Sequence, residues 1–418
     1  MKKRFLVAVL VMTLVLSGTV TAFGGESGGV KLQYNGTIVS LAGATIERID
    51  GKAMLPAAET MKAIGEEATS DAQYISAREL GTQLGYCVGW DAAEKTVVMF
   101  DPATLFAKTD EDFSIVRMLV KSDLDMEKAY ATTGKFNLDI TAYETANAML
   151  PITGYSISGK MDGIQQKSSS EMNMSLVFDF EKMFSGMPED QQALMAPFLV
   201  MFQNMEIKMK TNGETGETYV NSPLLSTITG TEGNNTWIKM NAYDSYENMG
   251  IDMKSIVAGN YSQAQLSDML ETAILNLDEI DAGTYGEIQD TYAMLKSYFG
   301  NVAFDTRTTG DITTHVLTLT DGTLEDFMED MAFNTNIIIK EKNGKLYHYD
   351  MSGNFESEDG TGAFDLSGDS KNVIYDLTID QKDVMKMSIE TESHISETTE
   401  SPDLSLPEDA NVIEFPMY

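Results

Sequence analysis

The chain has 418 residues, a formal net charge of −35 at pH 7 and one cysteine. This length allows two or more domains with substantial cores. A surface with so much negative charge repels phosphate backbones, so we expect no nucleic acid partner. Because one cysteine cannot form an internal disulfide, the fold must be stabilised by core burial. That cysteine, Cys87, lies in a strand-like run without an adjacent His or Lys, and we expect it to be a buried small apolar residue.

Residues 1–22 have the features of a signal peptide. A basic start, Lys2 to Arg4, precedes an apolar run from Phe5 to Leu16, and Val20-Thr21-Ala22 fits a small-x-small cleavage site. The apolar run is too short for a convincing membrane-spanning helix. No cysteine follows it for a lipoprotein anchor, and no sorting motif follows later. We therefore expect an exported protein that is secreted or associated with the cell surface.

Residues 30–103 are predicted to form a small first domain. Asn35-Gly36 lies within an alternating segment, Val30 to Leu41, and is a strong signal for a type I′ hairpin. An internal repeat follows at an offset of 20 positions. Its matched residues are Ala57 with Ala77, Glu59 with Glu79 and Gly65 with Gly85. Each copy predicts a short strand, a helix of two to three turns and a glycine that ends the helix in the left-handed conformation.

The second copy resembles a known family. The pattern Tyr74-Ile75-Ser76-Ala77-Arg78-Glu79-Leu80-Gly81, then Leu84-Gly85-Tyr86, Trp90-Asp91 and Lys95-Thr96-Val97-Val98, is similar to the N-terminal stalk domain of copper amine oxidases. The resemblance implies a structural or adhesive module that contacts a cell-wall or surface component. It does not extend to the oxidase chemistry, which needs three histidine ligands and a modifiable tyrosine. His315, His348 and His394 have no chelating spacing, so we expect no metal and no cofactor.

Residues 109–418 are predicted to form a second domain built mainly of strands. Between Met172 and Phe180 every second residue is apolar, and the same alternation recurs from Met205 to Met209. A period of two gives a strand with one apolar and one polar face. Similar alternation occurs around Phe136 and around Tyr375. Pro402 to Phe415 is predicted to be an extended tail that lies along a sheet edge.

Three predicted helical segments are available to cover the apolar face of this sheet. They are Phe113 to Tyr130, the apolar segment Leu194 to Met205, and a helical insert at about 252–300 that contains stripes from Leu266 to Phe299. A one-sided sheet must cover its apolar face. The expected fold class is therefore α+β, with a small βα-repeat stalk domain followed by a curved antiparallel half-barrel covered by helices.

The second domain resembles bacterial lipoprotein carriers and related lipid-binding exported proteins. The similar strings are Tyr219-Val220-Asn221-Ser222-Pro223-Leu224-Leu225, Trp237-Ile238-Lys239-Met240 and Leu406-Pro407-Glu408-Asp409-Ala410-Asn411-Val412-Ile413. The resemblance implies a half-barrel with a cavity between its concave face and the helices. The helical insert is longer than such a fold would require.

A hydrophobic ligand such as lipid is the partner that this arrangement favours. Methionine is flexible and polarizable, so a methionine-rich lining can adapt to irregular acyl chains. The candidate residues are Met172, Met174, Phe178, Phe198, Met201, Phe202, Met205, Ile207, Met209 and Met240. The alternative is that these side chains simply form the core between sheet and helices, since apolar stripes usually mark burial.

Catalytic motifs are missing from the sequence. It contains no Gly-x-Ser-x-Gly, no His-Glu-x-x-His and no phosphate-binding glycine loop. Carboxylates are so abundant that no acid/base pair can be singled out. We therefore expect a non-enzymatic exported surface protein with an attachment module and a ligand-binding domain. The alternative is a purely structural or adhesive protein with a closed core.

Overall fold

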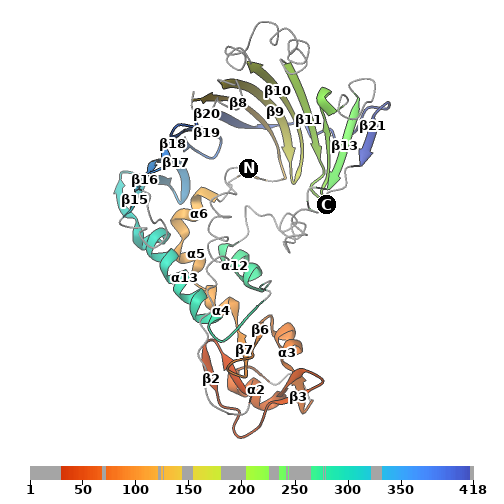
Figure 1. Ribbon diagram of the computed structural model, residues 1–418, viewed down its shortest axis with the longest axis vertical. Helices are drawn as coiled ribbons and strands as arrows, with labels where there is room; N and C mark the ends of the chain where they lie inside the picture. The colour runs from red at the N-terminus through yellow and green to blue at the C-terminus, as the bar shows by residue number, and fades with distance from the viewer. Residues whose placement is uncertain are drawn as a thin grey trace. The chain divides into compact units, whose positions relative to one another are not determined.

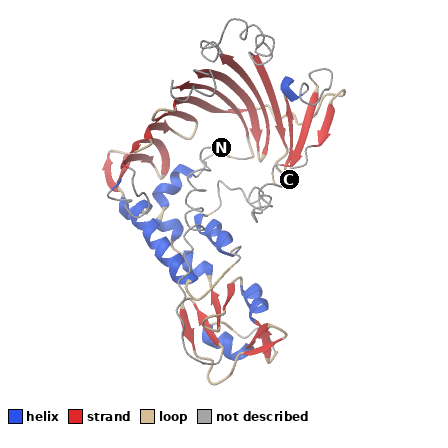
Figure 2. Cartoon of the chain, viewed as in Figure 1, coloured by secondary structure: helices blue, strands red, loops and turns tan. Residues whose placement is uncertain are grey.

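The computed structural model describes residues 30–67, 72–120, 124–125, 127–143, 154–179, 204–225, 235–241, 243, 265–275, 277, 279–321 and 332–414. The predicted signal peptide therefore lies outside the described residues. The chain divides into two compact units, residues 1–120 with 264–303 and residues 121–263 with 304–418. The protein is α+β and rich in strands, with one large, mainly antiparallel sheet in the second unit (Figure 2).

The first unit begins with the predicted hairpin. β1 (Lys31–Tyr34) and β2 (Thr37–Val39) are antiparallel, and Asn35 and Gly36 between them have φ of 47° and 76°. Positive φ at both turn residues is typical of a type I′ turn, so this prediction is confirmed. β1 lies parallel to β7 (Thr96–Phe100), and β7 pairs antiparallel with β6 (Cys87–Asp91). The result is a four-stranded sheet with the order β2-β1-β7-β6.

The sequence repeat gives two strand–helix pairs. β4 (Lys52–Pro56) leads into α2 (Ala57–Ile64), and β5 (Tyr74–Ser76) leads into α3 (Ala77–Leu84). The glycine that follows each helix is left-handed, with φ 86° at Gly65 and 72° at Gly85, as the repeat predicts. β4 pairs with both β3 (Glu47–Ile49) and β5, so the two copies share one three-stranded sheet.

The helical insert belongs to the first unit, which corrects its expected place in the sheet domain. α12 (Leu266–Leu275) and α13 (Thr284–Phe299) form one core with β6, β7 and α4 (Pro102–Phe106). The residues of this core are Cys87, Val98, Phe100, Phe106, Leu270, Ile274, Tyr285 and Ile288. The cause is that β7 is buried on both faces. Val97 and Met99 pack with α2 and α3 on one side, so Val98 and Phe100 need a second cover.

Residues 109–120 also belong to the first unit, contrary to the expected domain boundary. They form α5 (Thr109–Asp112) and α6 (Ser114–Val120), and Phe113 packs with Leu266 and Leu295. The 3₁₀-helix η2 (Asn301–Ala303) follows α13. The predicted helix from Phe113 to Tyr130 is wrong in its second half, because a strand begins at Ala129. That strand pairs on both sides, and this ladder outweighs the weak helical stripe.

The second unit contains a 14-stranded sheet, drawn as a strongly curved array in Figure 1. Its strands are β8 (Ala129–Ala142), β9 (Gly154–Gln166), β10 (Ser169–Asp179), β11 (Asn204–Thr211), β12 (Glu217–Asn221), β13 (Thr236–Asn241), β14 (Asp305–Thr309), β15 (Ile312–Thr320), β16 (Ala332–Lys342), β17 (Lys345–Ser357), β18 (Gly360–Gly368), β19 (Asn372–Gln381), β20 (Met385–Thr398) and β21 (Asn411–Glu414). The predicted helical segment Leu194 to Met205 lies mostly outside the described residues, and Met205 itself is in β11.

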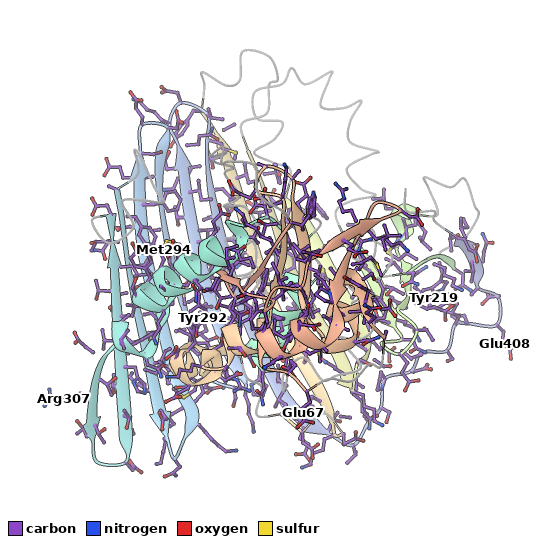
Figure 3. The ribbon with its side chains drawn as sticks, turned by 90° about the horizontal axis from the view of Figure 1, so that it is seen from below. Glu67, Tyr219, Tyr292, Met294, Arg307 and Glu408 are labelled. Carbon is purple, nitrogen blue, oxygen red and sulfur yellow. The ribbon has the colours of Figure 1, made fainter. Side chains whose placement is uncertain are left out.

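Two consecutive meanders make up this sheet. The strand order is β14 to β20, then β8 to β13, then β21. The meander that comes later in the chain, β14–β20, therefore ends beside β8, the first strand of the earlier meander. The β20–β8 pair runs from Met385 opposite Ala142 to Thr398 opposite Ala129. β21 adds in parallel to β13 at one edge, which agrees with the predicted extended tail. Figure 3 labels Arg307, on β14, at the opposite edge.

Candidate functional site

The predicted methionine-rich strands are direct neighbours in the sheet. In the β10–β11 register, Met172 lies opposite Met209, Met174 opposite Ile207 and Leu176 opposite Met205. Directly opposite residues project from the same face of a sheet. One face of this strand pair is therefore apolar, while the other carries Asn173, Ser175, Glu206 and Lys208.

This apolar face continues from β15 to β13. The register from strand to strand places the following residues on it: Leu317, Leu319, Phe333, Ile337, Ile339, Tyr349, Met351, Phe355, Phe364, Leu366, Tyr375, Leu377, Ile379, Met385, Met387, Ile389, Phe136, Leu138, Ile140, Tyr155, Ile157, Met161, Met172, Met174, Leu176, Phe178, Met205, Ile207, Met209, Val220, Ile238 and Met240. We call this set the apolar face.

Burial differs along the apolar face. At the β15–β17 end several side chains are buried, with Ile339 at 0%, Leu317 at 3% and Tyr349 at 5% exposure, while Phe333, Met351 and Phe355 are partly buried. From β18 through β20 and β8 to β11 most of the apolar side chains are only partly buried, including Met172 and Met174. A stretch of partly exposed apolar groups on a sheet is a candidate binding surface.

Glycines on the same face let aromatic rings lie close to the sheet backbone. A Cβ at Gly159 would come within 2.3 Å of the Phe136 ring, and one at Gly362 within 2.1 Å of the Phe355 ring. Each ring therefore occupies space that any other residue's side chain would need. Glycine at these positions thus makes room for the aromatic rings on the apolar face.

The ten predicted site residues divide into two groups. Seven are described, and all of them lie on the apolar face: Met172, Met174, Phe178, Met205, Ile207, Met209 and Met240. The other three, Phe198, Met201 and Phe202, lie outside the described residues. The partners contributed by β8, β9 and β17–β20 were missed. Their alternation is visible in the sequence around Phe136 and Tyr375, but it does not show which strands are neighbours.

Polar groups interrupt the apolar face near the β14 edge. His315 is 6% exposed; its Nδ1 lies 2.8 Å from the Thr306 hydroxyl, and its Nε2 lies 3.3 Å from a Glu341 carboxylate oxygen. Both ring nitrogens thus have partners, which satisfies the imidazole in a buried position. This arrangement is that of a structural histidine.

The described residues form no reactive centre of the kinds considered next. Within the described ranges, no group of three or more His, Cys, Asp or Glu side chains is placed to hold a metal ion. Cys87 is 3% exposed and its Sγ lies 3.7 Å from the carbonyl oxygen of Ile274. Burial raises the pKa of its thiol to about 12, so Cys87 is a buried small apolar residue, as predicted.

Comparisons with known proteins add little. No family model matches the chain, and no curated protein matches it. One similar solved structure is Ail, the attachment invasion locus protein of Yersinia pestis, with a TM-score of 0.12 and 6% identity over 65% of this chain and 99% of that one. Another is MucB in complex with MucA(peri), with a TM-score of 0.11 and 8% identity over 71% and 94%. Similarity this low carries no argument about fold or function. None of the described helices has the length and hydropathy of a membrane span.

Proposed function

We propose that the protein is an exported, non-catalytic surface protein whose sheet domain binds a hydrophobic ligand such as lipid. In this proposal the large sheet is a half-barrel, and the ligand lies against its apolar face. The first unit is a stalk-like module, similar to the N-terminal domain of copper amine oxidases, that attaches to a cell-wall or surface component. The signal peptide features of residues 1–22 support export.

The observation that carries this proposal is the incomplete burial of the apolar face. A protein core leaves little apolar surface accessible, since each buried methylene contributes about 0.8 kcal/mol. From β18 to β11, however, methionine, phenylalanine and leucine side chains remain partly exposed over many adjacent strands. Such a surface gains free energy when an apolar ligand covers it.

The composition of this surface favours a flexible ligand. Met161, Met172, Met174 and Met387 lie within the partly exposed stretch, and Phe136 lies over Gly159 beside them. Unbranched thioether side chains change rotamer at low cost, while flat rings provide a smooth contact area. The two together suit an acyl chain better than a rigid polar molecule.

A second function is favoured by the other end of the same face. At β15–β17 the side chains of Leu317, Leu319, Ile337, Ile339 and Tyr349 are buried, so this part of the face forms a closed core. If the closed region extends across the whole face, the protein is a purely structural or adhesive surface protein.

A binding experiment on the full mature chain separates these functions. Native mass spectrometry and solvent extraction would detect a co-purifying amphiphile, and a fluorescent fatty acid would serve as the added probe. We expect saturable probe binding that Met174→Glu weakens at least tenfold. Ser175→Glu is the matched control, because the neighbouring Ser175 is exposed on the polar face of the same strand. Absence of both amphiphile and probe binding in the wild-type protein would support the closed core.

A further inference from the structure

We propose that residues 399–414 are a separable strap, fastened across the polar face of the large sheet by Lys210, that can detach while β8–β12 stay folded. The chain leaves β20 at Thr398 and ends its described part in β21, paired with β13 (Figure 1). This inference rests on the fold and contacts of the second unit alone, and holds whether or not the apolar face binds a ligand.

The strap must be largely extended to make this connection. Between β20 and β21 lie seven inter-strand spacings, which span roughly 34 Å at about 4.8 Å each. The thirteen residue steps from Thr398 to Asn411 reach at most about 45 Å. Pro402 and Pro407 favour such a backbone, because proline and the residue before it prefer extended conformations.

Lys210 holds the middle of the strap. Its Nζ donates hydrogen bonds to the carbonyl oxygens of Asp403 and Ser405, both at 2.7 Å. The ammonium group also lies 3.8 Å from the carboxylate of Glu171 and 3.6 Å from that of Asp403. Glu171 is directly opposite Lys210 in the β10–β11 ladder, and its Oε2 accepts a hydrogen bond from the backbone N–H of Asp403 at 3.0 Å.

The end of the strap is held by the edge of the sheet. The backbone N–H of Asn411 donates to the carbonyl oxygen of Asn235 at 3.0 Å, and the side chain of Asn235 bonds to Asp409. The described part of the β13–β21 ladder runs from Asn411 to Glu414. Short ladders with exposed side chains open at low free energy.

Because Lys210 is buried, its hydrogen bonds are the main contacts that hold the strap on the sheet. Its side chain is 10% exposed, whereas the strap residues Asp403, Ser405 and Asp409 are all exposed. Figure 3 likewise labels Glu408 on the outer side of this segment. The apolar strap residues Leu404 and Leu406 are only partly buried. Hydrogen bonds from a charged group therefore supply much of the strap's attachment.

Native-state hydrogen exchange of the wild-type protein tests separability directly. We expect the amides of Asp403 and Asn411 to exchange through a partial opening, at lower denaturant than the amides of β8–β10. If these strap amides exchange only with global unfolding, the strap is an integral part of the sheet and the proposal is wrong.

The role of Lys210 is tested with two variants. Lys210→Met should increase exchange of the strap amides and of the β13–β21 ladder at least tenfold, with β8–β10 unchanged. Lys208→Met is the matched control, because Lys208 is exposed on the same strand and face, and it should leave strap exchange unchanged. Equal exchange in Lys210→Met and wild type would overturn the role of Lys210. Selective loosening of the strap in the Lys208→Met control would do the same.

Discussion

The carboxylate of Asp110 accepts a hydrogen bond at 2.9 Å from the backbone N–H of Leu266, 156 positions later in the sequence. The same carboxylate accepts hydrogen bonds from the Ser267 hydroxyl at 2.6 Å and pairs with Arg117 at 2.9 Å. Leu266 is the first residue of α12, so a residue of α5 caps a helix that is distant in sequence. This cap fastens the inserted helices to the N-terminal part of the first unit.

Loss of this cap should destabilise the first unit. Asp110→Ala removes the acceptor for the first N–H groups of α12, and we expect a loss of about 1–3 kcal/mol in its unfolding free energy. Urea denaturation followed by circular dichroism measures this change. Glu111→Ala is the control, since the Glu111 side chain is exposed on the same short helix. An equal effect of the two substitutions would contradict the capping role.

Two glycines of the first unit should respond to alanine in opposite directions. A Cβ at Gly89 would lie 2.0 Å from the carbonyl oxygen of Ile280, so Gly89→Ala pushes the inserted segment away from β6 and should cost about 1–3 kcal/mol. A Cβ at Gly286, within α13, would meet nothing within 4 Å. Gly286→Ala should therefore stabilise by about 0.5–1 kcal/mol through helix propensity. Thermal unfolding of both variants, compared with the wild type, measures the two shifts.

The contact between Phe136 and Gly159 on the apolar face is testable by a double-mutant cycle. Gly159→Ala places a Cβ in the space of the Phe136 ring and should destabilise the sheet by about 1–3 kcal/mol. Phe136→Leu should reduce that penalty, because the smaller side chain vacates part of the space. Additive effects in denaturant unfolding would show that the two positions do not interact.

Cys87 should make the stability of the first unit depend on alkaline pH. Burial raises the pKa of its thiol from 9.0 to about 12, so between these values the unfolded chain loses the proton and the folded chain keeps it. The folded state is then disfavoured progressively as the pH rises from about 9 to about 12. Unfolding free energies for wild type and Cys87→Ala over this range should differ in slope, with the wild type falling more steeply. Identical slopes would contradict a buried, protonated thiol.

Local sequence signals predicted a large part of the structure. Asn35-Gly36 indicated the hairpin, the repeat indicated the glycines that end α2 and α3, and strict alternation indicated the one-sided strands. These signals work because turn geometry and side-chain period are properties of a few neighbouring residues. The seven described candidate residues share one face for the same reason.

Partners of these elements could not be predicted in the same way. The stripe from Leu266 to Leu277 shows that a helix face is buried, but it does not show that β6 and β7 are what it packs on. The continuous apolar run Val97–Phe100 carried that information, since a strand without polar alternation is buried on both faces. Pairing of β20 with β8 joins residues more than two hundred positions apart, and periodicity contains nothing about such distances.

The pairing of β20 with β8 also has a consequence for synthesis. β8 can pair with β9 as soon as both have left the ribosome, whereas its other neighbour is among the last strands to be translated. In the interval, the fourteen-residue β8 presents a free edge to other nascent chains. A chain truncated before residue 385 would lack β20, so the edge of β8 would stay unpaired, and this product should aggregate.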